Sequence, residues 1–202
     1  MALTKINNNT LSAVTTLPAA IAVGSMIKLQ TQTASSSSTI TFSSTYITST
    51  YNRYIITMDS LNCSSDGGNI TADISINNGS SYLSSVANYL WIRGYSNTGG
   101  NADVWKANMG DAASSIFILG SGIGAGTTAP ETYSGTLTLL NTNSGKGKLI
   151  QVDGQFLGNG GQLVRQEVNM AHSSTSAINN IKFAPNTGTI TNGTFCLYGV
   201  IK

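Results

Sequence analysis

Charged side chains are scarce in this sequence. Asp, Glu, Lys and Arg make up 9% of its 202 residues, against about 25% in ordinary soluble domains. The net charge of +2 is too small to bind nucleic acid through phosphate neutralisation or to adsorb to an anionic membrane. The basic residues are scattered, and Lys146 and Lys148 are the one close pair. With so few acids, bases and ligands, we expect a scaffold or binding protein and not an enzyme.

Cysteine and histidine are nearly absent. Cys63 and Cys196 lie far apart in the sequence, which excludes a disulfide-rich framework but leaves open one bridge or two buried thiols. The single histidine, His172, lies beside a polar stretch and is interpreted as a loop or strand-end residue. Zinc sites need clustered His and Cys at short spacing. The sequence therefore predicts no metal and no cofactor.

The acidic residues show no arrangement that indicates catalysis. Asp59, Asp66 and Asp73 lie near one another in sequence, but Asp66 is in a turn and Asp73 is on the polar face of an expected strand. Hydrolysis of a sugar linkage needs two carboxyl groups that face one cleft. Calcium binding at Asp66 would need a spaced series of oxygen ligands, which the turn lacks. We expect neither site.

Long apolar runs and proline are also missing. No run of 18 apolar residues occurs, so no membrane helix is predicted. Residues 11–27 are mildly apolar but interrupted, and they lack the basic start of a signal peptide. With 22 Gly and 3 Pro, the composition favours many tight turns over a disordered tail. The glycine run at 120–126 lacks the Lys-Ser/Thr pair and the helix of a phosphate loop, so we interpret it as a flexible connection.

Alternation of apolar and polar residues is the main pattern that is present. Residues 70–76 place Ile or Ala at every second position, and residues 193–201 place Phe195 and Leu197 on one face. Turn clusters separate the segments, as at 64–68 and 77–79, the second of them of hairpin type. No convincing amphipathic helix occurs, so the pattern predicts an all-β sandwich or barrel with antiparallel sheets. Further strands are expected at 26–31, 39–43, 51–61, 82–95, 136–140, 149–156 and 177–183, and residues 116–119 form a short apolar run.

The first 34 residues differ from the rest. They contain Lys5, the run Asn7–Asn9 and an apolar segment at 17–23, and we interpret them as an extended arm that leads into a strand. Ala34 and the serines at 35–38 are predicted to form a low-complexity hinge. The sequence thus predicts an N-terminal arm at 1–34 and a β-domain at 35–202.

One aromatic group allows two interpretations. Trp91, Tyr95 and Trp105 flank a Gly/Asn turn, with Arg93 between the first two. Aromatic rings beside Arg and Asn suit sugar stacking or a protein contact. Large aromatic side chains also dominate core burial. The four residues are candidates for ligand or partner contact, and packing in the core is the alternative.

Two segments resemble a jelly-roll module of tailed-bacteriophage virion proteins. The first is Ile40-Thr41-Phe42 followed by Tyr51-Asn52-Arg53-Tyr54-Ile55-Ile56. The second runs from Ala177–Phe183 to the final strand with Phe195-Cys196-Leu197-Tyr198-Gly199. The start, Met1–Ile6, is similar to the attachment arm of phage tail and fibre proteins. The resemblance implies an antiparallel jelly-roll-like β-sandwich, a homotrimer, and an arm that docks on the particle through Leu3, Ile6, Leu11, Leu17 and Ile21.

The resemblance also implies a function. We expect a non-enzymatic structural protein of a tailed-phage virion, tail-fibre or knob-like, that is assembled in the host cytoplasm. Its partners would be its own copies, other virion proteins of the tail or capsid, and a host surface glycan, with no nucleic acid and no membrane. A capsid decoration protein on the head shell is the alternative. A capsule depolymerase is disfavoured by the sparse acids, and a bacterial surface adhesin would need an export signal that is not seen.

Overall fold

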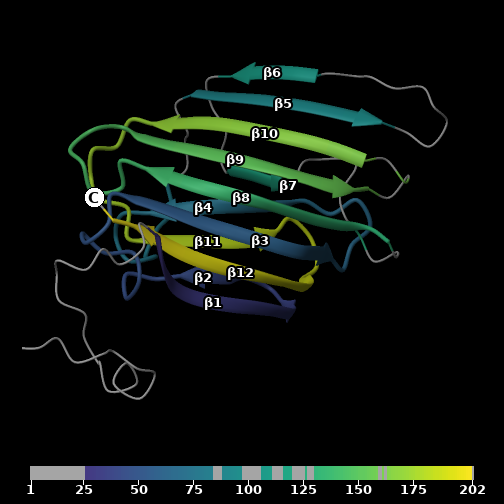
Figure 1. Ribbon diagram of the computed structural model, residues 1–202, viewed down its shortest axis with the longest axis horizontal. Helices are drawn as coiled ribbons and strands as arrows, with labels where there is room; N and C mark the ends of the chain where they lie inside the picture. Colours follow the sequence, from purple (N-terminus) through teal and green to yellow (C-terminus); the bar gives the residue numbers. More distant parts are fainter. Residues whose placement is uncertain are drawn as a thin grey trace, which may run out of the picture.

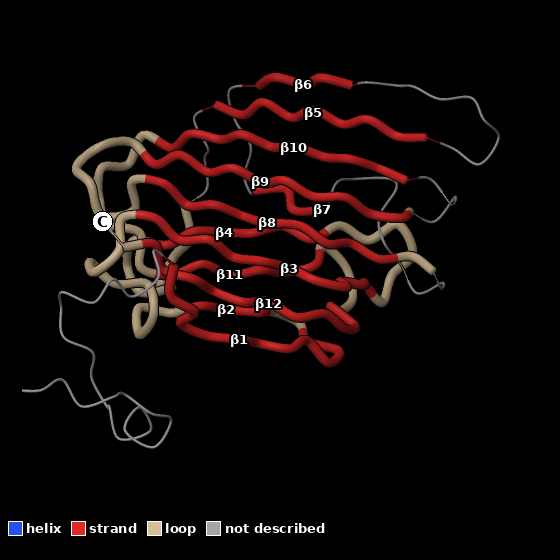
Figure 2. Tube along the Cα trace, viewed as in Figure 1, coloured by secondary structure: helices blue, strands red, loops and turns tan. Residues whose placement is uncertain are grey.

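The protein is built from two antiparallel β-sheets that pack face to face (Figure 1). The computed structural model describes residues 26–83, 88–96, 106–110, 116–119, 126, 130–158, 161 and 163–201. Within these residues there are twelve strands and no helix (Figure 2). In spatial order, the larger sheet consists of β1 (Met26–Ser37), β12 (Ile190–Val200), β3 (Arg53–Cys63), β8 (Thr132–Leu140), β9 (Lys148–Leu157), β10 (Leu163–His172), β5 (Asn88–Ser96) and β6 (Lys106–Gly110). The smaller sheet consists of β2 (Ile40–Phe42), β11 (Asn180–Pro185), β4 (Ile70–Ser75) and β7 (Ile116–Leu119).

Pairing between strands from opposite ends of the sequence defines the topology. β1 pairs with β12, β2 with β11, β3 with β8 and β4 with β7, always antiparallel. First with last and second with last but one is the order of a jelly roll. The pairs β5–β6 and β9–β10 lie outside this eight-strand pattern and extend the larger sheet. The predicted all-β, jelly-roll-like sandwich is confirmed.

The core fills the space between the sheets, and strands alternate between side chains that face it and side chains that face away. In β9, for example, Ile150, Val152 and Phe156 are buried while Gln151, Asp153 and Gln155 are exposed. Burying such a side chain stabilises the fold by about 1.5–3 kcal/mol. Phe183 of the smaller sheet meets Phe195 of the larger one with ring centroids 5.1 Å apart, so aromatic packing joins the two layers.

Two glycines make room in this core for Tyr133. Gly135 of β8 and Gly154 of β9 are opposite each other in the ladder. A Cβ atom at either position would collide with the hydroxyl of Tyr133, whose side chain is fully buried. Since no other residue lacks a Cβ, both positions require glycine.

The hinge predicted at Ser35–Ser38 is wrong. β1 continues to Ser37 because its backbone stays paired with β12, with Ala34 opposite Gly193 and Ser37 opposite Ile190. The boundary predicted at residue 34 therefore falls inside a strand of the larger sheet. Residues 1–25 of the predicted arm lie outside the described residues.

Three other predictions have mixed outcomes. The turn at 77–79 is confirmed, with positive φ at Asn78 and Gly79, but it forms no hairpin because β4 and β5 belong to different sheets. The strands β6 and β10 are not among those predicted, and the short apolar run at 116–119 forms β7. Cys63 and Cys196 are free thiols, but only Cys63 is buried, so the alternative of two buried thiols holds for one of them; burial raises the pKa of Cys63 to about 11.

Candidate functional site

The residues singled out from the sequence are only partly described. Trp91, Arg93 and Tyr95 belong to β5, where the ladder places them opposite Val168, Gln166 and Val164 of β10. Whether these three residues contact a ligand stays a prediction. Trp105 and the five arm residues Leu3, Ile6, Leu11, Leu17 and Ile21 lie outside the described residues.

The remaining chemical candidates occupy separate places in the fold. His172 ends β10, as expected, and its Nδ1 accepts a hydrogen bond of 2.9 Å from the backbone N–H of Ser174. Partial burial lowers the pKa of His172. Asp59 accepts a hydrogen bond from the Ser134 hydroxyl at 3.0 Å, and Asp73 forms an ion pair with Lys182 at 3.1 Å. These contacts hold strands together.

Two hollows that are lined by described residues lie on the outer face of the larger sheet, which is the face away from the smaller sheet. We call the first the polar trough. It crosses β8, β9 and β10 and encloses about 190 Å³. Its six polar side chains are Thr136, Thr138, Gln151, Asp153, Glu167 and Asn169.

Register aligns the polar trough into two cross-strand rows. Thr138, Gln151 and Asn169 form one row, and Thr136, Asp153 and Glu167 form the next. In the first row, the Gln151 amide donates to the Asn169 side-chain oxygen at 3.4 Å.

Arg165 borders the second row. Its guanidinium lies 2.6 Å from the Asp153 carboxylate and 3.3 Å from the Glu167 carboxylate. The polar trough is therefore a surface of hydrogen-bonding side chains on three neighbouring strands, β8, β9 and β10.

The two carboxylates of the polar trough are directly opposite each other in the ladder. Retaining glycosidases also use two neighbouring carboxyl groups, but the environment of this pair differs. Both side chains are about half exposed, at 52% for Asp153 and 47% for Glu167, and they share one guanidinium. A catalytic acid in such enzymes is placed in a desolvated pocket instead. The arrangement suits binding through hydrogen bonds better than proton transfer.

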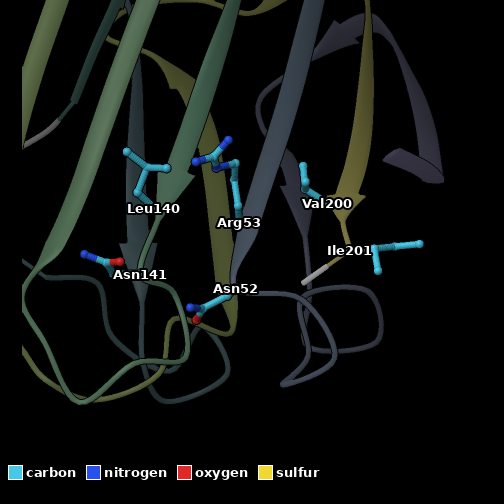
Figure 3. A pocket seen from close by; sticks show the side chains of 6 residues that line it. All are labelled: Asn52, Arg53, Leu140, Asn141, Val200 and Ile201. Atoms are coloured by element: carbon cyan, nitrogen blue, oxygen red, sulfur yellow. The ribbon is translucent and has the colours of Figure 1, made fainter. Parts of the chain in front are cut away.

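The second hollow, which we call the apolar groove after the exposed apolar side chains beside it, lies at the end of the sheet where β12 stops. It encloses about 300 Å³, and three polar residues, Asn52, Arg53 and Asn141, line it together with Leu140, Val200 and Ile201 (Figure 3).

A row of cross-strand neighbours runs through the apolar groove. The row is Met26, Val200, Arg53, Leu140 and Leu149. Met26 and Leu149, at its two ends, are 47% and 45% exposed, and Ile201 is 43% exposed. Exposed large apolar side chains beside a hollow mark a surface suited to protein contact.

A buried lysine holds the loop at the edge of the apolar groove. Lys148 is fully buried, and its ammonium donates to the carbonyls of Asn141 at 2.9 Å, Ser144 at 2.7 Å and Thr175 at 3.5 Å. Burial lowers the pKa of Lys148. The side chain of Asn143 donates to the carbonyls of Thr48 and Tyr51, which ties the same loop to the one before β3.

Sequence reasoning missed both hollows. The polar trough depends on β10, which is not among the predicted strands, and on the register of three strands. One signal was present: β9 alternates Gln151, Asp153 and Gln155 with apolar residues, which indicates a polar outer face. The groove combines segments that are more than 50 residues apart in sequence, so no local pattern indicates it.

Comparisons with known proteins add no relative. No protein-family model, no curated protein and no solved structure matches the chain. In the part of the chain that is described, no group of three or more His, Cys, Asp or Glu is arranged to hold a metal ion. The same residues include no helix with the length and apolar character needed to cross a bilayer.

Proposed function

We propose that this protein is a non-enzymatic structural component of a tailed-phage virion, tail-fibre or knob-like, that contacts the host surface. The observation that carries the proposal is the jelly-roll pairing of β1 with β12, β2 with β11, β3 with β8 and β4 with β7. Viral capsid and lectin domains share this architecture. The shared architecture supports this role by analogy, and so does the resemblance at 40–56 and 177–202.

The position of the first described strand supports an attachment role for the arm. β1 begins at Met26, which is paired with Val200 near the end of the chain. Residues 1–25 therefore join the β-domain at the end of the sheet that carries the apolar groove. Docking on the particle through Leu3, Ile6, Leu11, Leu17 and Ile21 would leave the opposite end of the sheet free to project.

The apolar groove supports self-association into a homotrimer. Leu149 projects from the same row of the sheet as the hollow beside Leu140 and Val200. The exposed Leu149 side chain, which we call the knob, would insert into the apolar groove of a neighbouring copy. The number of copies, three, is taken from the resemblance to phage virion proteins. Burying the exposed apolar surface is the driving force.

The mass of the purified full-length chain tests self-association. Light scattering after size-exclusion chromatography is expected to give about 63 kDa, three times the chain mass of 21.0 kDa. Leu149→Arg places a charge on the knob and should shift the mass toward one chain. Leu163→Arg is the matched control, because Leu163 is 56% exposed on β10 and lies outside the groove. A 21 kDa wild type, or an unchanged Leu149→Arg variant, contradicts this part of the proposal.

The location of the protein on the phage particle tests its proposed role as a component of the tail. Gold-labelled antibody against the β-domain should mark the tail of intact phage particles, at a few to a few dozen copies. Hundreds of copies on the head would establish the alternative, a capsid decoration protein. Absence of the protein from purified particles would overturn both roles.

A further inference from the structure

We propose that the polar trough is a binding site for an uncharged saccharide. This inference rests on the proposed contact with a host surface and names the ligand class and the site. Thr138, Gln151 and Asn169 form one row of the trough, and Asp153 and Glu167 lie in the next. Hydroxyl groups are both donors and acceptors, and amide, hydroxyl and carboxylate side chains match both functions.

The arrangement of these groups fits a sugar ring. Strands in a sheet lie about 4.8 Å apart, so polar groups in one row repeat at intervals comparable with the width of a pyranose. The two rows belong to β8, β9 and β10, which are paired along most of their length. A site on paired strands is held more rigidly than one on loops, so little ordering is required when a ligand binds.

An apolar border adjoins the polar rows. The ladder continues from Asn169 to Leu90 and from Glu167 to Ile92, both on β5 and both half-buried. A pyranose ring has hydroxyl groups around its edge and an apolar patch of C–H groups on one face. Binding sites for small molecules combine apolar walls with a few placed polar groups in the same way. The trough and its border therefore offer a surface for each side of the ring.

The charges select for an uncharged ligand. The guanidinium of Arg165 already binds both carboxylates of the trough, at 2.6 Å from Asp153 and 3.3 Å from Glu167. No other described cation lines the hollow. Two carboxylates and one guanidinium leave the trough with a net negative charge, which repels a uronic or sialic acid, whereas a neutral hexose or deoxyhexose would meet acceptors for its hydroxyl groups.

A glycan array tests the inference directly. The labelled full-length protein is applied to neutral hexose and deoxyhexose tri- and tetrasaccharides, together with uronic-acid and sialylated counterparts. At least one neutral glycan is expected to bind, with the acidic counterparts at least tenfold weaker. The best neutral glycan is then titrated calorimetrically against Gln151→Ala and Asn169→Ala, which should each weaken binding at least tenfold. Asp153→Asn preserves the shape of the trough and should weaken it several-fold.

A matched control lies on the same strand. Gln155 is exposed on the same face of β9 but does not line the trough, so Gln155→Ala should bind within twofold of the wild type. Thermal melting of each variant checks that the fold is intact. The inference is overturned if no neutral glycan binds, if acidic glycans bind best, or if Gln151→Ala binds like Gln155→Ala. Each of these results leaves the mass and particle measurements unchanged, so a failed site and a failed function remain distinguishable.

Discussion

The buried side chain of Lys148 holds in place the loop at the edge of the apolar groove, although Lys148 itself is not exposed there. Its ammonium bonds three carbonyls and has no carboxylate partner among the residues described. Its positive charge is therefore balanced by carbonyl dipoles, and its hydrogen bonds hold the loop that borders the apolar groove. In sequence, Lys146 and Lys148 look alike, but Lys146 is exposed and Lys148 is the first buried position of β9.

Lys148→Met should be strongly destabilising. The variant keeps most of the side-chain volume but leaves the carbonyls of Asn141, Ser144 and Thr175 without this donor, and each unsatisfied buried group costs about 1–3 kcal/mol. We expect a loss of about 3 kcal/mol in the free energy of unfolding, measured by urea denaturation. Lys146→Met serves as the control and should lose less than about 0.5 kcal/mol. Equal effects of the two substitutions would refute the role assigned to Lys148.

At the scale of the element, strands with regular alternation of apolar and polar residues could be predicted from the sequence. Strands in which a buried polar residue breaks that alternation could not. β4 and β12 show clean alternation, and the structure confirms their buried faces. In β10, Gln166 occupies a buried position and breaks the apolar pattern. Its amide donates to the carbonyl of Ile118 in β7 at 3.1 Å, a partner 48 positions away in sequence. Because the partner of this amide N–H group is a tertiary contact, the sequence alone does not identify the strand or the trough it helps to form.

Strand position should set the rate of amide hydrogen exchange. β3 has β12 on one side and β8 on the other, whereas β1 is an edge strand with a bulge between Lys28 and Gln30. Every second amide of an edge strand lacks a sheet partner, and edges open at lower free energy than central strands. Exchange followed by mass spectrometry should protect peptides from β3 and β12 most and those from β1 and the three-residue β2 least. Slower exchange in β1 than in β3 would show that another chain covers the edge in solution.

At the scale of the whole molecule, shape and apolar packing carry the fold, and charge contributes little. The described residues contain three ion pairs, two of which share Arg165 at the surface. Exposed pairs contribute about 0–1 kcal/mol each and are screened by salt. The scarcity of charge was visible in the sequence. The pairing of first strand with last was not, because it depends on contacts between opposite ends of the chain.

The melting temperature should accordingly be almost independent of salt. Raising sodium chloride from about 0.05 M to about 0.5 M should change Tm by less than about 4 °C, since the screened pairs are few and exposed. Scanning calorimetry at both concentrations measures this. A fall of about 10 °C or more would mean that a charge network stabilises the assembled protein, which conflicts with apolar packing as the main source of its stability.

The adjacency of Met26 and Val200 has a practical consequence. Fluorophores placed on either side of this pair would stand close enough for efficient energy transfer while the sheet is intact. Separation of β1 from β12 would lower the efficiency of energy transfer even while the core between the sheets stays folded. Energy transfer between labels near Met26 and Val200 would thus report the detachment of the edge strand β1 from β12.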